Sequence, residues 1–327
     1  MMLEEIDVKN IELIKKVNDF ILKKPNIDVK QTFQWYNLRK EKKYFLYAMQ
    51  NNEIIFCCNA FEVIDLEYCK PCLYIPRGPV FDENNINMTQ CVEAICNFAR
   101  KKEIQYVRIN PKIKNATLID ENKKIDYTIT NKNDFDKMFE SYREASLKIN
   151  EFSLERLLDN FHYKTRYNIR KSYRNGLNNT ISTDVFDLKT FYELYLQTAE
   201  RHKFSPHPLK YFEELIKNFK ENVVFCTVAN QGKVLAMSIN IKISNTMYYL
   251  YGVSSNEQKN MFACYNLHWS MISYAKENEF EYYNFGGVFS NDDDVENKDY
   301  GLLIFKSRFC YNGLEEFIPD IIIKVRG

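Results

Sequence analysis

The sequence predicts an α/β or α+β fold made of two similar units. The chain has 327 residues, which is enough for two domains of about 150 residues each. Both halves show the same order of elements, a hairpin, a strand, a helix and a closing strand, as an internal duplication would. Strands mixed with helices in this order exclude a helical bundle and a β-sandwich.

The first half opens with an amphipathic helix over residues 8–24, in which Ile11, Ile14, Val17 and Ile21 share one face and Pro25 ends the segment. Alternating apolar residues and turn signals predict the elements that follow. These are strands Tyr44–Met49 and Ile54–Ala60 around the turn Asn51–Glu53, a strand Leu73–Ile75, a helix Met88–Arg100 and a strand Ile104–Asn110.

The second half repeats this series. It contains strands Val223–Val228 and Val234–Ile243 around the turn Asn230–Gly232, an aromatic strand Met247–Val253, a helix Phe262–Lys276 and a strand Phe280–Phe285. A last strand, Ile318–Val325, could pair with either sheet.

Between the halves we expect a linker near 145–152 and then two helices. Ser153 suits the N-cap of a helix Leu154–Asn160. A second helix extends from His162 to Asn175, and Gly176 fits its C′ position.

Composition excludes several classes of protein. The chain has only nine glycines, and none of them forms a Rossmann G-x-G-x-x-G or a Walker P-loop. Four histidines leave little for a multi-histidine metal site. The net charge is +1, so any contact with nucleic acid must be a local patch. No apolar run reaches 18 residues, and the acidic N-terminus does not fit a signal peptide.

Nine cysteines in a chain without an export signal predict free thiols in a reducing compartment. Cys69 and Cys72 form one C-x-x-C with no second pair. It is either a redox or metal pair or, as we prefer, a set of structural thiols.

The segment Lys164–Gly176 concentrates positive charge on one helix. Arg166, Arg170 and Arg174 fall at i, i+4 and i+8 and form a cationic stripe. Three tyrosines lie among five cations, which are Lys164, Arg166, Arg170, Lys171 and Arg174. Such a pattern suits a phosphate backbone with exposed bases, although a solvated helix face would look the same.

This segment, KTRYNIRKSYRNG, and four other motifs resemble the FemABX family of aminoacyl-tRNA-dependent peptidyltransferases, in its compact type without a helical arm. The other motifs are Pro76–Pro79, Arg108–Pro111, Tyr282–Gly287 and Gly301–Phe309, and a helix with Thr198–Arg201 follows the basic segment. The motifs lie in order over nearly the whole chain, and the resemblance is looser before residue 70.

The resemblance implies two tandem GNAT-like (acyl-CoA N-acyltransferase-like) domains. These would be residues 1–147, completed by the C-terminal strand 317–327, and residues 148–316. It implies transfer of an amino acid from aminoacyl-tRNA to an amine of a peptidoglycan precursor, UDP-MurNAc-pentapeptide or a lipid II-type molecule. We also expect a cytoplasmic monomer that associates with the inner face of the membrane and needs no cofactor and no metal.

Aminolysis of an activated ester needs close approach of the reactants and stabilisation of an oxyanion. Lys306 and Phe305 match the family's Phe-Lys near the reaction centre, so we expect Lys306 to stabilise the oxyanion or the ester with help from the backbone near Phe305. A surface lysine is the alternative. The five cations of Lys164–Arg174 would bind the tRNA.

For the acceptor, the resemblance places a cation after Trp35, and either Arg39 or Lys40 could hold an anion. His207 stands where the family has an arginine four residues before a tyrosine, here Tyr211. Histidine is shorter and only partly charged at pH 7, so this anion clamp is weaker, and a simple loop histidine is the alternative.

Asn110 replaces an aspartate of the compact members and cannot take a proton, so either no base is needed there or the acceptor differs. Tyr251 is either a pocket residue or a core tyrosine.

Three rival functions remain open. An acyl-CoA-dependent acyltransferase would need a glycine-rich loop, but Met261 replaces its first glycine within Gln258–Ala263. The changes at Asn110 and His207 would suit a tRNA-dependent transferase that acts on a peptide or small molecule outside the cell wall. A non-catalytic binding protein is the third.

Overall fold

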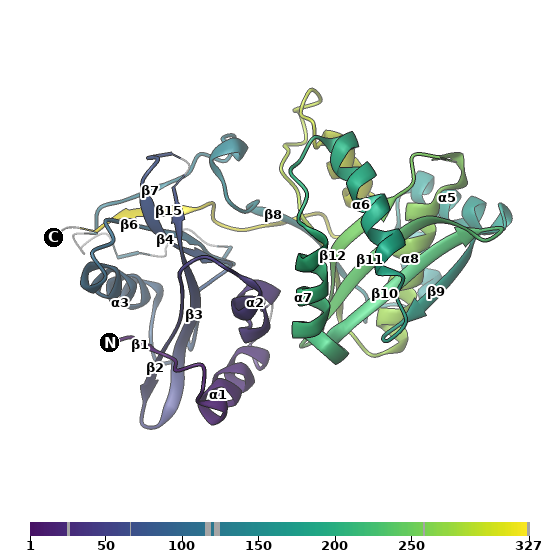
Figure 1. Cartoon of the computed structure of the whole chain (residues 1–327). Helices are drawn as coiled ribbons and strands as arrows, with labels where there is room; N and C mark the ends of the chain where they lie inside the picture. The colour runs from purple at the N-terminus through teal and green to yellow at the C-terminus, as the bar shows by residue number, and fades with distance from the viewer. Residues whose placement is uncertain (25–26, 66, 115–118, 121–124, 258, 326–327) are drawn as a thin grey trace. The chain divides into compact units, whose positions relative to one another are not determined.

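The computed structural model describes residues 1–24, 27–65, 67–114, 119–120, 125–257 and 259–325. They form two compact units, each with its own mixed sheet (Figure 1). The first unit comprises Met1–Arg143, Gly287–Asn291 and Glu316–Gly327, and the second comprises Glu144–Gly286 and Asp292–Glu315. The predicted α/β class is confirmed.

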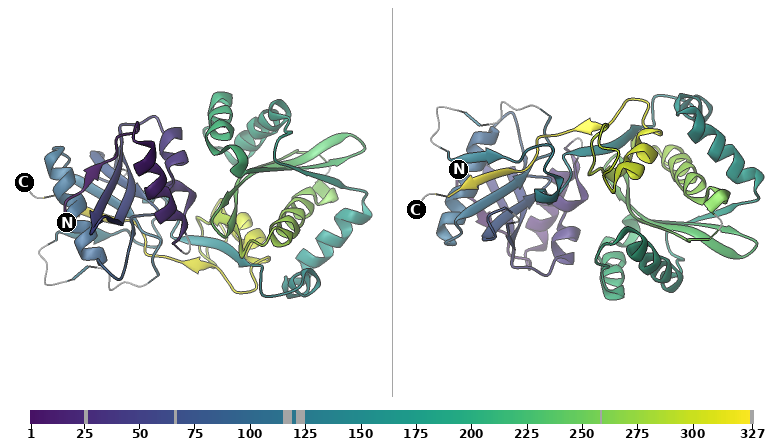
Figure 2. Two further views of the ribbon diagram at one scale, coloured as in Figure 1. Left: turned by 90° about the horizontal axis from the view of Figure 1, so that it is seen from below. Right: turned by 90° about the horizontal axis from the view of Figure 1, so that it is seen from above.

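The sheet of the first unit has the order β1-β2-β3-β4-β6-β15-β7, with β5 paired to β3. Its strands are β1 (Glu4–Glu5), β2 (Lys43–Gln50), β3 (Glu53–Ile64), β4 (Pro71–Pro76), β5 (Val80–Phe81), β6 (Tyr106–Asn110), β7 (Tyr127–Ile129) and β15 (Ile321–Lys324). Helices α1 (Ile11–Leu22) and α2 (Phe33–Leu38) cover one face, and α3 (Met88–Lys101) covers the other (Figure 2).

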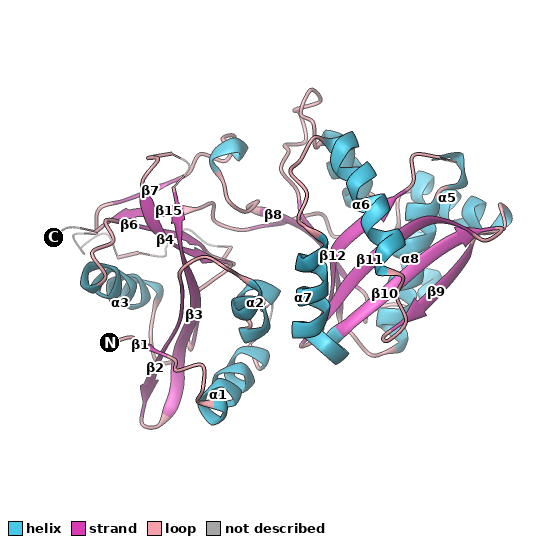
Figure 3. Ribbon diagram, viewed as in Figure 1, coloured by secondary structure: helices cyan, strands magenta, loops and turns pink. Residues whose placement is uncertain are grey.

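The sheet of the second unit has the order β9-β10-β11-β12-β13-β8-β14. Its strands are β8 (Arg143–Lys148), β9 (Asn178–Ser182), β10 (Val223–Asn230), β11 (Lys233–Ile243), β12 (Thr246–Ser254), β13 (Tyr282–Gly287) and β14 (Glu315–Glu316). Its helices are α4 (Leu154–Asn160), α5 (Tyr163–Arg174), α6 (Leu188–His202), α7 (Leu209–Phe219), α8 (Ala263–Glu277) and α9 (Tyr300–Ser307). Helices α6 and α7 lie on one face of the sheet, and α5 and α8 on the other (Figure 3).

The two sheets share one plan. The series β2-β3-β4-α3-β6 of the first unit recurs as β10-β11-β12-α8-β13 in the second. The last strand, β15, is antiparallel to β6 and β7 and lies between them. In the second sheet the corresponding place is taken by β8, which precedes the whole series in the chain.

Local signals in the sequence located several helix ends correctly. The Ser153 side chain accepts a hydrogen bond from the backbone of Arg156 at 3.3 Å and caps α4. Gly176 follows α5 with φ +75°, the left-handed conformation that favours glycine after a helix. The prediction that Ile11 belongs to the buried face of α1 is wrong, because Ile11 is the first helical residue and is 78% exposed. Pro25 lies outside the described residues.

The predicted linker near 145–152 is also wrong in its first part. Residues Arg143–Lys148 form β8, and Ala145 and Leu147 are wholly buried in the core of the second unit. This strand contains both polar and apolar residues and has no turn residues at its start, so its pattern does not separate it from a connection. Pairing in the sheet decides its conformation.

Candidate active site

The parallel strands β12 and β13 separate in the middle of the second sheet. Their ladder covers three positions, from Thr246↔Tyr282 to Tyr248↔Asn284. The equivalent pair in the first sheet, β4 and β6, stays paired over five positions. We call the place where this ladder ends, beyond Tyr248 on β12 and Asn284 on β13, the opening between the two strands.

A β-bulge lies at this opening. Tyr249 faces Asn240 on β11 and Tyr251 faces Ile239, so Leu250 is an extra residue. Gly252 permits the local packing, because a Cβ at this position would lie 1.4 Å from the Tyr249 hydroxyl oxygen. The bulge and the glycine together let the Tyr249 ring fold over its own strand.

Lys306 reaches the same opening from α9. Its side chain is buried, with 7% exposure, so the alternative of a surface lysine is excluded. A Cβ placed on Gly286 would lie 3.8 Å from Lys306 Nζ and 4.0 Å from the Tyr249 carbonyl oxygen. Gly286 has φ +83° at the end of β13. The ammonium group thus lies where β12 and β13 part.

Burial determines the ionisation of this centre. It lowers the pKa of Lys306 to about 8, and the negative charge of Glu144 opposes that shift. Burial, together with the positive charge of Lys306, lowers the pKa of His268 to about 3. His268 is therefore neutral at pH 7, and its Nδ1 lies 2.9 Å from the Tyr283 hydroxyl. Lys306 is the cation of the centre.

Phe305, next to Lys306, packs into the aromatic core behind it. Its ring lies 5.0 Å from Tyr265 and 5.4 Å from His268, measured between centroids. These contacts fix α9 against α8, so they hold the Lys306 backbone in place. Phe305 acts in this structure as a packing residue.

Three of the residues predicted to bind the acceptor lie close together in the second unit. The hydroxyls of Tyr211 on α7 and Tyr251 on β12 are 2.8 Å apart. The His207 ring stacks on Tyr211 with centroids 4.1 Å apart. The backbone N–H of His207 donates to the Tyr195 hydroxyl at 3.2 Å. Tyr251 is half-buried and lies on β12 beyond Tyr248, where the ladder with β13 has ended. Because Leu250 is an extra residue, the Tyr251 ring lies on the α7 face of the sheet, whereas Tyr249 packs against His268 of α8.

The other three residues predicted for the acceptor lie in the first unit. Arg39 is held by Glu41, with Nε donating to Oε2 at 3.0 Å. Lys40 is exposed. Asn110 is wholly buried, and its amide donates to Asp320 at 2.7 Å. Asn110 therefore belongs to the interior of this unit, where Arg108 also binds Asp320.

The basic helix is α5, and its three tyrosines are exposed. The solvent-exposed fractions are 61% for Tyr163, 52% for Tyr167 and 45% for Tyr173. Lys164, Arg170 and Arg174 are also exposed. Arg166 differs, because its Nη1 donates to the carbonyls of Asp159 and Phe161 and so ties α4 to α5. Lys171 lies over the Tyr167 and Phe262 rings.

The start of α5 is attached to the end of α9. The His162 N–H donates to the Arg308 carbonyl at 3.0 Å, and the Phe161 and Phe309 rings are 5.3 Å apart. Arg308 is two residues beyond Lys306. Helix α5 therefore begins beside the element that carries the buried lysine.

Two residues of this centre were not predicted. Glu144 lies at the start of β8, beside the expected linker, and is 3% exposed. Asn284 lies inside the quoted motif Tyr282–Gly287, so that motif was the signal that could have identified it. Its amide donates to Glu144 Oε2 at 3.0 Å.

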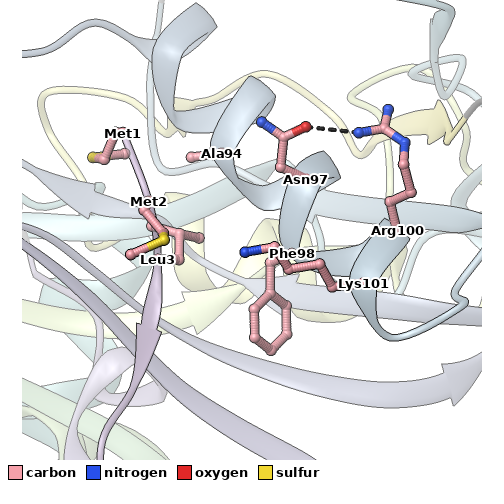
Figure 4. A pocket seen from close by; sticks show the side chains of 8 residues that line it. All are labelled: Met1, Met2, Leu3, Ala94, Asn97, Phe98, Arg100 and Lys101. Atoms are coloured by element: carbon pink, nitrogen blue, oxygen red, sulfur yellow. Dashed lines mark hydrogen bonds between the residues drawn. The ribbon is translucent and has the colours of Figure 1, made fainter.

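A groove of about 360 Å³ lies elsewhere, on the first unit (Figure 4). It is lined by Met1, Met2, Leu3, Ala94, Asn97, Phe98, Arg100 and Lys101. Arg100 donates to Asn97 at 2.7 Å there. The lining has cations but no carboxylate or histidine to act on a substrate, so we do not assign the chemistry to this groove.

No cluster of three or more potential metal ligands occurs among the described residues. Cys69 is exposed and Cys72 is buried, and burial raises the pKa of Cys72 to about 12. Because a thiolate is the reactive form, this shift disfavours redox chemistry at the C-x-x-C. No helix in the described part of the chain is long and apolar enough to cross a membrane.

Known proteins resemble this chain over nearly its full length. The model of the FemAB family matches residues 14–231 and 227–327. A UDP-N-acetylmuramoylpentapeptide-lysine N(6)-alanyltransferase of Weissella viridescens is 22% identical, over 97% of this chain and 95% of that protein. A lipid II:glycine glycyltransferase of Staphylococcus epidermidis is 36% identical over 76 residues, which cover 23% of this chain and 18% of the glycyltransferase.

Solved structures confirm the tandem GNAT-like fold. The crystal structure of FemX superposes with a TM-score of 0.77 at 18% identity, over 99% of this chain and 98% of FemX. A tandem GNAT protein from the clavulanic acid biosynthesis pathway gives a TM-score of 0.54 at 8% identity, over 99% of each chain.

Proposed function

Because the chain belongs to the FemAB family, we propose that it transfers an amino acid from aminoacyl-tRNA to an amine of a peptidoglycan precursor peptide. Its relatives named as alanyl- and glycyltransferases place it among the aminoacyltransferases. The observation that carries the proposal is the buried Lys306 ammonium at the opening between β12 and β13.

The proposed reaction is aminolysis of an ester. The acceptor amine attacks the aminoacyl carbonyl, and a C–N bond forms while the carbonyl oxygen becomes an oxyanion. The C–O bond to the ribose then breaks, and the proton released by the amine ends on the ribose hydroxyl. The ester is already activated, so the step needs no ATP and we propose no cofactor.

Lys306 would supply the electrostatic part of this catalysis. A fixed positive charge in a water-poor site stabilises a developing oxyanion more strongly than a solvated charge does. With a pKa of about 8, Lys306 is mostly charged at pH 7. The Phe305 contacts keep the lysine in position rather than taking part in the bond changes.

Helix α5 would bind the tRNA donor. It offers exposed cations for phosphates and exposed tyrosines on which unpaired bases can stack. Its first turn is bonded to Arg308, close in sequence to Lys306. A single strand bound along α5 with its aminoacylated end at His162 would therefore approach the reaction centre.

Removing two charges from α5 is expected to weaken tRNA binding measurably. We expect the double substitution Arg170→Gln and Arg174→Gln to lower tRNA affinity about tenfold at moderate salt. The slope of log K against log salt should fall by about 1.4 to 1.8, because each lost phosphate contact removes about 0.7 to 0.9. Filter binding over a salt series measures both quantities.

The matched control removes two exposed lysines of the same unit, with Lys189→Gln and Lys217→Gln. This control should leave the salt slope unchanged. Equal losses in both double variants would indicate a general charge effect and argue against α5 as the tRNA site.

The acceptor would bind with its anionic groups near the aromatic cluster. Tyr211 and Tyr251 supply two hydroxyls and His207 an imidazole ring, and Tyr251 lies on β12 beyond the end of its ladder with β13. In the first unit the candidate cations are Arg39, which Glu41 holds, and the exposed Lys40. The Asn110 amide cannot take a proton and is wholly buried, so we propose that the residue at this position does not deprotonate the amine.

The rival acyl-CoA donor is disfavoured by Met261. Its partly buried side chain packs against the core of the second unit, just before α8. A pyrophosphate at this helix start would need close approach to the backbone, which glycine permits and Met261 does not. Gln258 of the same loop lies outside the described residues. Calorimetric titration with acetyl-CoA tests the point, and clear binding would overturn the proposed donor.

We further propose that the protein acts in the cytoplasm as a monomer, where it meets tRNA and precursors attached to nucleotide or to lipid at the inner face of the membrane. Lipid-linked acceptors would require only peripheral contact with that surface.

The deciding experiment offers purified protein a panel of radiolabelled aminoacyl-tRNAs with UDP-linked and lipid-linked muropeptides. We expect transfer of one amino acid to one of the two acceptor classes, detected by chromatography of the labelled product. Binding of tRNA without transfer to either class would favour an acceptor outside the cell wall, which the changes at Asn110 and His207 would suit. Absence of both tRNA binding and transfer would refute the proposed function.

A further inference from the structure

Glu144 is a buried carboxylate that the proposed chemistry does not yet use. It lies in β8, with 3% of its surface exposed. One oxygen, Oε2, accepts a hydrogen bond from the Asn284 amide at 3.0 Å. An ionised carboxylate away from water is costly unless a hydrogen bond and an opposite charge compensate it. A cation close to Glu144 would therefore stabilise both groups.

Asn284 connects Glu144 to the strand end beside Lys306. Its Nδ2 donates to Glu144, while its Oδ1 accepts from the Gly286 N–H at 2.6 Å. A Cβ on Gly286 would in turn lie 3.8 Å from Lys306 Nζ. Asn284 thus links the buried Glu144 carboxylate to the backbone of Gly286, the residue that lies beside the Lys306 ammonium.

Glu144 is a buried group whose negative charge favours the ammonium form of Lys306, and several other groups near Lys306 are neutral. From α8 comes His268, which is neutral at pH 7. Burial raises the pKa of Cys310 to about 12, so this thiol is neutral as well. Asp299, the residue before α9, is half-exposed, and solvent weakens its effect. Tyr249 and Tyr283 are also neutral, because burial raises the pKa of each phenol.

We propose that Glu144 is a positioning residue for aminoacyl transfer, which keeps Lys306 in its ammonium form and, through Asn284, holds the Gly286 turn beside it. The proposal rests on the proposed function for its catalytic consequence. Glu144 and Asn284 would have different effects on Lys306, and substitutions can separate these effects. The charge of Glu144 acts on the ionisation of Lys306, whereas the Asn284 amide acts on geometry.

The test begins with Glu144→Gln, which keeps the size of the side chain and removes its charge. Without the carboxylate the ammonium form of Lys306 is less stable, so Lys306 should lose its proton at a pH about 1 to 3 lower. In wild type, the alkaline fall of kcat/KM should lie near pH 8. In the variant it should move to about pH 5 to 7, so the loss at pH 7.5 should be at least about threefold and larger than the loss at pH 6.

Two further variants separate charge from geometry. Asn284→Ala should lower kcat/KM at every pH without moving the alkaline fall, because Glu144 keeps its charge. Glu144→Asp keeps a negative charge, so its pH profile should lie between the profiles of wild type and Glu144→Gln. Glu155→Gln, at an exposed position of α4, is the matched control and should change neither quantity. Circular dichroism verifies that each variant is folded.

A direct readout keeps this proposal distinct from the proposed function. Competitive acetylation of Lys306 with acetic anhydride, measured by mass spectrometry across pH 6 to 10, reports its protonation without any turnover. An unchanged titration of Lys306 in folded Glu144→Gln would overturn the role of Glu144, whatever the enzyme transfers. A shifted titration with no aminoacyl transfer by the wild type would refute the proposed function and leave the charge pairing supported.

Discussion

Lys306→Met is expected to lower kcat/KM for aminoacyl transfer by about 100- to 1,000-fold, or about 3 to 4 kcal/mol of transition-state stabilisation. Methionine has a similar length and suits a buried site, but it carries no charge to offset the oxyanion. The loss should fall on kcat more than on KM, because the oxyanion exists only in the transition state. Steady-state transfer from radiolabelled aminoacyl-tRNA measures both constants.

Lys189→Met is the matched control, since Lys189 is exposed on α6. It should leave kcat/KM within about twofold of the wild-type value. Because Lys306→Met leaves Glu144 without its counter-charge, the melting temperature of the variant is recorded alongside. A folded Lys306→Met enzyme with wild-type turnover would remove Lys306 from the mechanism.

Arg108→Met is expected to destabilise the first unit by about 3 to 5 kcal/mol. Arg108 is wholly buried, and its guanidinium binds Asp65 at 2.6 Å and Asp320 at 2.8 Å. Removing it leaves two buried carboxylates without a cation. Chemical denaturation at pH 7, followed by circular dichroism, should show an earlier transition for the variant.

The size of this loss should depend on pH. Burial already raises the pKa of Asp320 above its usual value, and the Arg108 charge opposes that shift. In the variant the folded-state pKa rises further, so Asp320 binds a proton more tightly in the folded state than in the unfolded state. Stability is then retained below the unfolded pKa and lost as pH rises through the folded pKa. The deficit should be smaller near pH 4 to 5 than at pH 7.

Glu5→Ala, which removes an exposed partner of Lys102, is the control and should cost about 1 kcal/mol or less. If Arg108→Met cost no more than this control at pH 7, the buried ion cluster would not be the main polar support of the first unit.

The two units share a plan, yet only the second has the proposed chemistry. In the first unit β4 and β6 remain paired as far as Asn110, and the Asn110 amide binds Asp320 near the start of β15. In the second unit the ladder of β12 and β13 stops at Tyr248 and Asn284, and the Lys306 ammonium lies beside the strand end at Gly286. The two units therefore differ in the side chains that lie at the ends of equivalent strands, β4 and β6 in the first and β12 and β13 in the second.

The sequence by itself determined the features that depend on near neighbours. The order of strands and helices follows from apolar periodicity, and the ends of α4 and α5 follow from Ser153 and Gly176. The run Lys164–Arg174 predicted the basic helix, whereas Lys306 was singled out only by the resemblance of its motif to that of the family. The elements and their ends could be predicted because backbone conformation and capping depend mostly on residues a few positions apart.

Only the tertiary structure decided which polar groups are buried and what they face. Arg143–Lys148 was expected to contain part of a linker, but pairing within the second sheet makes it a strand and buries Glu144. Asn110 was expected at the acceptor, but Asp320, 210 residues away, binds it in the interior. Burial and pairing of charges depend on residues brought together from distant parts of the chain, and these set the ionisation of Lys306.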